Sequence, residues 1–203
     1  TPMNPSFKPA WWLPGAHLQT LWASFLRTPV TLKRTRERLW LADGDFIDLD
    51  WHGPHDAEAP LVLLLHGLTG SSSSHYILGQ QQALAAQGWA SVALNWRGCS
   101  GEPNLLPRGY HSGVSDDLGL VIAHLQAARP LAPLYAVGYS LGANVLLPYL
   151  GERGAPPGLQ AALAAQAGRA HAAERRAQVA GHPGVDPDDA GAQLRGQAMG
   201  AVQ

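Results

Sequence analysis

The sequence has little cysteine, few charged residues and no long hydrophobic run. Among its 203 residues, Cys99 is the single cysteine, so neither an intramolecular disulfide nor a zinc site of several cysteines can form; we expect Cys99 to be a packed side chain. No apolar run approaches about 18 residues and no signal-peptide pattern is visible, so we expect a cytoplasmic protein without a transmembrane segment. Its 14 basic and 15 acidic side chains give no sign of nucleic-acid binding.

Aromatic residues are missing from the C-terminal part of the chain. All seven tryptophans lie at or before Trp96. Residues 155–203 hold no Phe, Trp, Tyr, Ile or Lys, and Ala, Gly, Arg and Pro make up 30 of these 49 residues. Because large side chains dominate core burial, we expect this tail to be poorly ordered and to add no strand to a sheet. Residues 159–180 could form an Ala-rich helix, and the composition resembles a GC-rich gene translated out of frame or a foreign end.

The N-terminal segment, residues 1–29, is by contrast rich in aromatic residues. Its apolar side chains recur on one face of a helix, which predicts a helix packed on the domain. The alternatives are a helix that contacts a membrane surface peripherally and a part of a substrate lid. The residues with helical spacing are Leu18, Leu21, Trp22, Phe25 and Leu26.

Residues 30–154 alternate between strand patterns and helix patterns. Apolar and polar residues alternate on both sides of Asp43-Gly44, which predicts a β-hairpin. After it, three continuous apolar runs predict strands buried on both faces, and each run precedes a helical segment. This order predicts an α/β fold in which an open, mostly parallel sheet carries helices on both faces. The expected hairpin strands are 38–42 and 45–51, the buried strands are 61–65, 90–96 and 134–137, and the helices are 76–87, 114–128 and 141–150.

A serine lies between two glycines where the last of these strands meets its helix. Gly138-Tyr139-Ser140-Leu141-Gly142 has the form of a nucleophile elbow. The glycines let strand and helix approach closely, and a helix N-terminus aims backbone N–H groups at developing negative charge. We therefore expect Ser140 to be a nucleophile; the alternative is a serine in an ordinary tight turn.

Two backbone N–H groups are the candidates for an oxyanion hole. The loop 66–70 follows the first buried strand, and we expect the N–H groups of Leu68 and Leu141 to bind the oxyanion. We expect His66 and His111 to line a pocket or to hold loops by hydrogen bonds rather than to act as the catalytic base. The sequence indicates neither a metal site nor a cofactor.

Five regions of the chain form a specific combination: Trp11-Trp12-Leu13 with His17–Trp22, His66-Gly67-Leu68, Asn95–Glu102, Tyr110–Gly113 and Gly138–Gly142. Together they resemble the YheT-like branch of the α/β-hydrolases. The resemblance covers about residues 7–154 and then ends, which implies an α/β-hydrolase fold truncated after the nucleophile helix. It also implies a serine hydrolase without a cofactor that acts on small carboxylic esters, short-chain or acylglycerol-like, with Ser140 as the nucleophile.

The acid and the histidine of a catalytic triad stay unassigned. Triads of this fold run serine, then Asp or Glu, then His. Glu174 and His182 have this order, and His171 is a further histidine, but none follows a strand pattern. Two functions therefore stay open: an esterase, or a non-catalytic remnant or binding module that has an elbow but no base. A thioesterase or acyltransferase would use the same elbow, and the oligomeric state is not indicated.

Overall fold

The computed structural model of the protein describes residues 30–107 and 114–165. The helix expected within residues 1–29, His111 and most of the C-terminal tail lie outside this part of the chain. All the described elements lie in the compact unit that begins at Leu32. In chain order they are β1 (Thr35–Trp40), β2 (Phe46–His52), β3 (Leu61–Leu65), α2 (His75–Ala86), β4 (Ala90–Asn95), α3 (Val114–Ala128), β5 (Leu134–Tyr139), α4 (Leu141–Arg153) and β6 (Leu159–Ala165).

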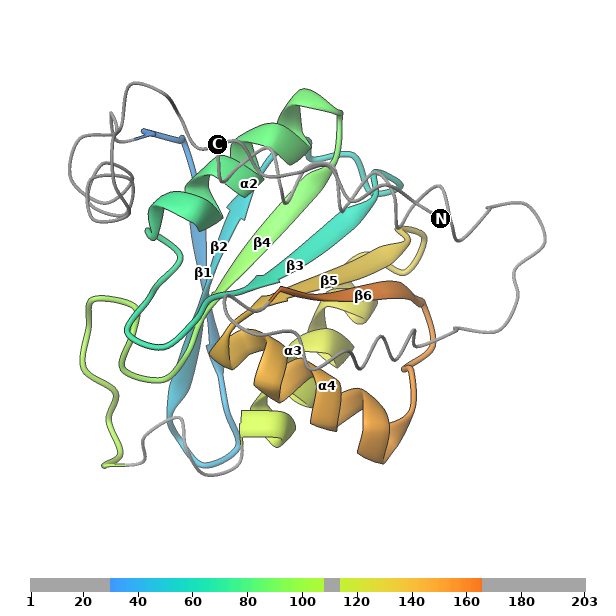
Figure 1. The fold of residues 1–203 in the computed structure, drawn as a ribbon. Helices are drawn as coiled ribbons and strands as arrows, with labels where there is room; N and C mark the ends of the chain where they lie inside the picture. Colours follow the sequence, from blue (N-terminus) through green and yellow to red (C-terminus); the bar gives the residue numbers. More distant parts are fainter. Residues whose placement is uncertain (1–29, 108–113, 166–203) are drawn as a thin grey trace, which may run out of the picture. The chain divides into compact units, whose positions relative to one another are not determined.

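The six strands form one mixed sheet in the order β1-β2-β4-β3-β5-β6 (Figure 1). β1 and β2 form an antiparallel hairpin that turns at Gly44, whose φ of +85° suits a glycine. β2 is also antiparallel to β4, whereas β4, β3, β5 and β6 are all parallel. α2 covers one face of the sheet, and α3 and α4 cover the other. The predicted α/β architecture is confirmed.

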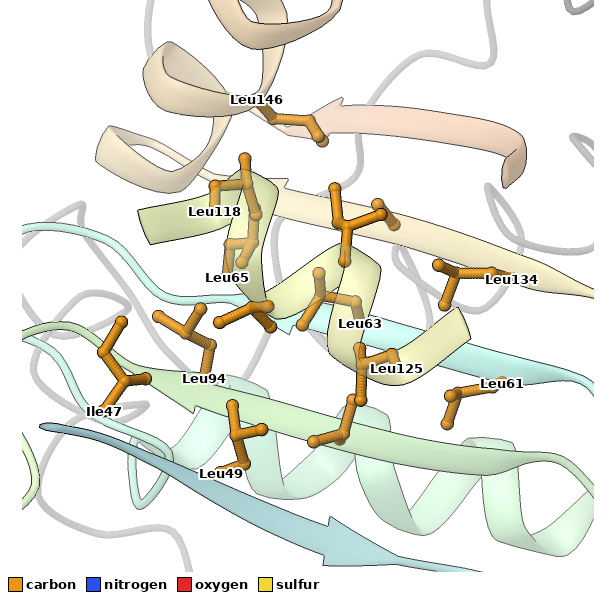
Figure 2. Packing of buried hydrophobic residues seen from close by; sticks show 14 of the residues in the cluster. Ile47, Leu49, Leu61, Leu63, Leu65, Leu94, Leu118, Leu125, Leu134 and Leu146 are labelled. Carbon is orange, nitrogen blue, oxygen red and sulfur yellow. The ribbon is translucent and has the colours of Figure 1, made fainter. Parts of the chain in front are cut away.

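Both faces of the central strands are buried. Leu61, Leu63 and Leu65 of β3 belong to a cluster on the face of α3 and α4, which Figure 2 shows from close by. Val62 and Leu64, which alternate with them, belong to a second cluster beneath α2. Full burial of one such side chain contributes about 1.5–3 kcal/mol. This two-sided burial explains why the strand has a continuous apolar run instead of an alternating pattern.

The expectation that nothing after Gly154 joins the sheet is wrong. β6 pairs in parallel with β5 from Leu159 opposite Leu134 to Ala165 opposite Tyr139, with a register shift near its start. Residues 159–165 are therefore not part of an Ala-rich helix, and within the described residues β6, not β5, is the edge strand. The weak strand propensity of alanine is overridden because pairing with β5 satisfies the backbone N–H and C=O groups.

Candidate active site

Ser140 lies at the turn between β5 and α4 with its backbone in a rarely populated conformation. Its φ is 50° and its ψ is −107°, a combination that costs free energy for a residue with a side chain. The Ser140 N–H donates to the carbonyl oxygen of Ala165 at 2.9 Å, so the end of β6 helps to hold the turn. The side chain is exposed, and its hydroxyl makes no hydrogen bond with another described residue.

The two glycines of the elbow leave no room for a side chain. A Cβ atom at Gly138 would lie 2.6 Å from the carbonyl carbon and oxygen of Gly142. A Cβ atom at Gly142 would lie 2.8 Å from the carbonyl carbon of Leu65, and closer still to its oxygen. Glycine is therefore required at both positions for β5, α4 and β3 to approach this closely.

The loop that follows β3 passes directly beside Ser140. A Cβ atom at Gly67 would lie 3.2 Å from the Ser140 Cβ. Within the described residues, Thr69 in this loop (φ 57°) and Ser140 are the two non-glycine residues with positive φ. Because costly backbone conformations cluster at functional sites, this coincidence indicates that the loop and the elbow belong to one site.

The backbone N–H groups of this loop are not equally available. The Gly67 N–H donates to the Tyr76 hydroxyl at 2.9 Å, and the Gly70 N–H donates to the Gly67 carbonyl at 3.1 Å. The Leu68 N–H has no hydrogen-bond partner among the described residues, and the residue is 56% exposed. The Leu141 N–H lies in the first turn of α4, where N–H groups lack intrahelical partners. The two groups expected to bind an oxyanion are thus both unoccupied by the described residues.

His66 is buried, and both of its ring nitrogens are used. Its Nδ1 lies 2.8 Å from the Gly67 carbonyl oxygen, and the Trp96 N–H donates to its Nε2 at 3.3 Å. These partners fix a neutral ring with its proton on Nδ1. Burial lowers the pKa of His66, and the hydrogen bond to Gly67 opposes this shift only in part. In this arrangement His66 holds the loop and has no free nitrogen to take a proton from Ser140.

Comparison with a model of the family described as "alpha/beta hydrolase fold" gives a match over residues 60–191, more than half of the chain. The chain belongs to the alpha/beta hydrolase fold family. The match begins at β3 and includes the loop, the elbow and β6.

Two curated relatives narrow the resemblance within the alpha/beta hydrolases. The Escherichia coli (strain K12) protein "Putative esterase YheT" is 42% identical over 142 residues, which cover 69% of this chain and 42% of that protein. The Bos taurus protein "Phospholipase ABHD3" is 37% identical over 164 residues, which cover 77% of this chain and 40% of that protein. The chain thus spans about two fifths of the length of these relatives. The resemblance to the YheT-like branch is confirmed.

Solved structures agree with the alpha/beta hydrolase assignment. The thioesterase domain from the curacin biosynthetic pathway superposes with a TM-score of 0.53 at 25% identity, covering 65% of this chain and 46% of that domain. A serine hydrolase without a lid from Xanthomonas campestris has the same TM-score at 22% identity, covering 68% of this chain and 63% of that protein. The second likeness concerns the fold alone.

A buried ion network holds the loop that follows β4. The Arg97 guanidinium donates to both carboxylate oxygens of Asp117 at 2.7 and 2.8 Å, and it reaches Asp43 at 2.7 Å and Asp45 at 3.2 Å. The hydrogen bonds to Asp117 are the main cause of a raised pKa of Arg97, which burial opposes. The network joins the hairpin turn, the loop and α3. No local sequence pattern indicates this network, because these residues are distant in the chain.

Several residues singled out in the sequence lie outside the described part of the chain. These are His111, His171, Glu174 and His182, so the structure does not locate a catalytic acid or base.

Cys99 is partly buried against the larger core cluster, and burial raises the pKa of its thiol. Among the described residues, no helix has the length and hydrophobicity to cross a membrane, and no cluster of His, Cys, Asp or Glu could hold a metal ion.

A groove of about 620 Å³ lies at the opposite end of the sheet from Ser140. Its lining residues include Trp51 and His52 at the end of β2 and Arg129 after α3. His52 pairs with Ser91 near the amino end of β4, whereas Ser140 follows the carboxyl end of β5. Ligands of open α/β sheets bind beyond the carboxyl ends of the strands, so we do not assign this groove to the Ser140 site.

Proposed function

We propose that this chain carries the nucleophile and the oxyanion hole of a serine esterase, with Ser140 as the nucleophile. The strained turn supports this most directly: Ser140 has a positive φ, is exposed, and lies between two glycines that cannot carry a side chain. The names of the relatives, an esterase and a phospholipase, favour a carboxylic ester as the substrate, short-chain or acylglycerol-like.

In the proposed reaction, the Ser140 Oγ attacks the carbonyl carbon of the ester, and the carbonyl oxygen becomes an oxyanion. The N–H groups of Leu68 and Leu141 stabilise that charge, the Ser140 hydroxyl proton passes to solvent, and the alcohol leaves with a proton taken from solvent. Water then hydrolyses the acyl-serine ester, which releases the carboxylic acid and restores the Ser140 hydroxyl. A serine hydroxyl is a weak nucleophile unless a base accepts its proton. No histidine within the described residues makes a hydrogen bond with Ser140, so we expect slow turnover from the chain as it stands.

The test compares the wild type with Ser140→Ala, using Ser73→Ala as a matched control because Ser73 is an exposed serine that hydrogen-bonds Arg34 instead. A fluorophosphonate probe should label the wild type and Ser73→Ala, slowly but at a single site, and should not label Ser140→Ala. Hydrolysis of p-nitrophenyl acetate by the wild type should exceed that of Ser140→Ala little or not at all.

One result would contradict the proposed nucleophile, and another would contradict the expected slow turnover. Equal labelling of the wild type and Ser140→Ala would exclude Ser140 as the nucleophile. Rapid Ser140-dependent turnover that disappears in His171→Ala or His182→Ala would show that the C-terminal tail supplies a base. Specific binding of an ester without labelling or turnover would favour the alternative function, a non-catalytic binding module.

A further inference from the structure

A phenol hydroxyl lies inside the loop that passes beside Ser140. It belongs to Tyr76, the second residue of α2, and it accepts the hydrogen bond from the Gly67 N–H at 2.9 Å. A Cβ atom at Gly70 would lie 3.0 Å from this hydroxyl, and one at Gly67 would lie 3.7 Å from it. The hydroxyl therefore occupies the inside of the turn from Gly67 to Gly70.

The ring of Tyr76 also contacts the elbow. It packs against the ring of Tyr139, the residue before Ser140, with centroids 5.0 Å apart and planes inclined by 56°. The Tyr139 hydroxyl donates to Gln80 Oε1 at 3.2 Å. Burial, with a smaller contribution from Tyr76, raises the pKa of Tyr139 to about 12, so that hydroxyl stays neutral. Tyr76 thus touches both backbone segments of the site, one through its hydroxyl and one through its ring.

The direction of the Leu68 N–H follows from the bonds made by Gly67. In a planar trans peptide, the Leu68 N–H points opposite to the Gly67 carbonyl. That carbonyl oxygen accepts hydrogen bonds from His66 Nδ1 at 2.8 Å and from the Gly70 N–H at 3.1 Å. The preceding peptide plane is held at the Gly67 N–H by Tyr76. Both planes that flank Gly67 are therefore fixed, although a glycine would otherwise rotate freely.

We propose that Tyr76 is a positioning residue of the oxyanion hole: by accepting the Gly67 N–H, its hydroxyl fixes the peptide plane before Gly67 and so helps the bonds of the Gly67 carbonyl to hold the Leu68 N–H in place as the donor of this loop. The proposal rests on the proposed function in so far as the hole serves Ser140. An oxyanion donor is effective when it is already oriented before the charge develops. Without the hydroxyl, the Gly67 N–H loses its partner and the loop gains freedom to turn the Leu68 N–H away.

The test is Tyr76→Phe, which keeps the ring against Tyr139 but removes the hydroxyl. Tyr135→Phe is the matched control, because Tyr135 packs in the same cluster beneath α2, stacked on Trp89, and its hydroxyl has no hydrogen bond within the described residues. The first measurement is amide hydrogen exchange of Gly67 by NMR in the unliganded protein. We expect exchange to be at least about tenfold faster in Tyr76→Phe and unchanged in Tyr135→Phe, since the amide loses its acceptor.

The second measurement is the rate of fluorophosphonate labelling as a function of probe concentration. In this reaction the bond from Ser140 Oγ to phosphorus forms, the bond from phosphorus to fluorine breaks, fluoride leaves, and the hydroxyl proton passes to solvent. We expect the maximal labelling rate of Tyr76→Phe to fall about tenfold, less than the 10²–10³-fold typical for removing an oxyanion donor outright. The probe concentration at half-maximal rate should not change, because the N–H acts on the developing charge rather than on probe binding.

Each outcome decides part of the proposal. Unchanged amide hydrogen exchange of Gly67 in Tyr76→Phe would show that the Tyr76 hydroxyl does not hold the Gly67 N–H. Faster exchange with an unchanged maximal rate, or with only weaker probe binding, would overturn the positioning role. If the wild type is not labelled at Ser140, the proposed nucleophile fails, and the exchange measurement alone still supports or overturns the contact between Tyr76 and Gly67.

Discussion

At one edge of the sheet, β1 and β2 are joined by charged side chains. Arg36 faces Asp50 and Arg38 faces Asp48 across the hairpin, each pair with two hydrogen bonds of 2.8 to 2.9 Å. At the other edge, β6 contains only Leu, Gln and Ala. Ion pairs therefore help to hold the first edge. The second edge is held by backbone pairing between β5 and β6, beside the elbow where β5, α4 and β3 approach closely.

This difference predicts that the two regions are destabilised by different kinds of substitution. The charged region includes the hairpin turn, where Arg97 reaches Asp43 and Asp45, and it should be damaged when a charge is removed. The region of the elbow should be damaged when even one methyl group is added, because Gly138 and Gly142 leave no space for a Cβ atom. Substitutions in the two regions can therefore test whether each is held as the structure indicates.

The largest effect is expected for Arg97→Met. It leaves the buried carboxylates of Asp45 and Asp117 without their cation, which should lower the free energy of unfolding by about 3–5 kcal/mol. Arg153→Met is the matched control because Arg153 pairs with Asp116 on the surface, where loss of an ion pair costs no more than about 1 kcal/mol. Urea unfolding followed by tryptophan fluorescence measures both. Equal losses in the two variants would show that burial of the Arg97 network does not matter.

A smaller but clear loss is expected for Gly142→Ala. The new Cβ atom would clash with the Leu65 carbonyl, and overpacking of this kind costs about 1–3 kcal/mol. Gly151→Ala lies in the same helix with nothing within 4 Å of the added atom. It should therefore be neutral or stabilise the protein by up to about 1 kcal/mol, because alanine favours a helix over glycine. If both substitutions had the same effect, close packing would not be what holds the elbow.

Most of the sheet could be predicted from local patterns. The continuous apolar run 61–65 is β3 itself, and the predicted ends of the other strands and helices up to α4 differ from the observed ends by no more than three residues. These patterns are readable because two-sided burial makes a strand apolar throughout. The turn that carries Ser140 was likewise predicted from its two glycines, whose spacing reflects the close approach of strand and helix.

What local patterns did not predict depends on contacts between distant segments. β6 has the composition of a helix, and only its pairing with β5 makes it a strand. The rule that a strand and its crossover helix return to a parallel strand could have indicated it. The contact of Tyr76 with Gly67 and the bond from Ser140 to Ala165 arise from the folded arrangement, and no local motif encodes them.

The smallest effect concerns the charged edge and depends on pH. Burial is the largest single influence and alone would raise the pKa of Asp48, but hydrogen bonds to the carboxylate, chiefly those from Arg38, together with the positive charges of Arg38 and Arg36 outweigh it, and the pKa is lowered from 3.8. A carboxyl group with a lowered pKa stabilises the folded state fully above its unfolded pKa and loses this contribution as pH falls through the folded value. Asp48→Asn should therefore cost about 1 kcal/mol near neutral pH, and its difference from the wild type should shrink as the pH falls below 3.8.

Glu102→Gln is the control for this last prediction, because Glu102 also binds Arg38, at 2.8 Å, but is 59% exposed. Solvent screens an exposed pair, so this substitution should change the free energy of unfolding by only a few tenths of a kcal/mol at any pH, within about ±0.5. Urea unfolding of the three proteins at about pH 6 and about pH 2.5 separates the two carboxylates. His66 is present in all three proteins, so its own protonation cancels in the comparison. An equal loss in the free energy of unfolding for Glu102→Gln and Asp48→Asn would mean that burial of the carboxylate does not set the strength of its pair with Arg38. Buried ion pairs would then not be what distinguishes the charged edge of the sheet from the other edge.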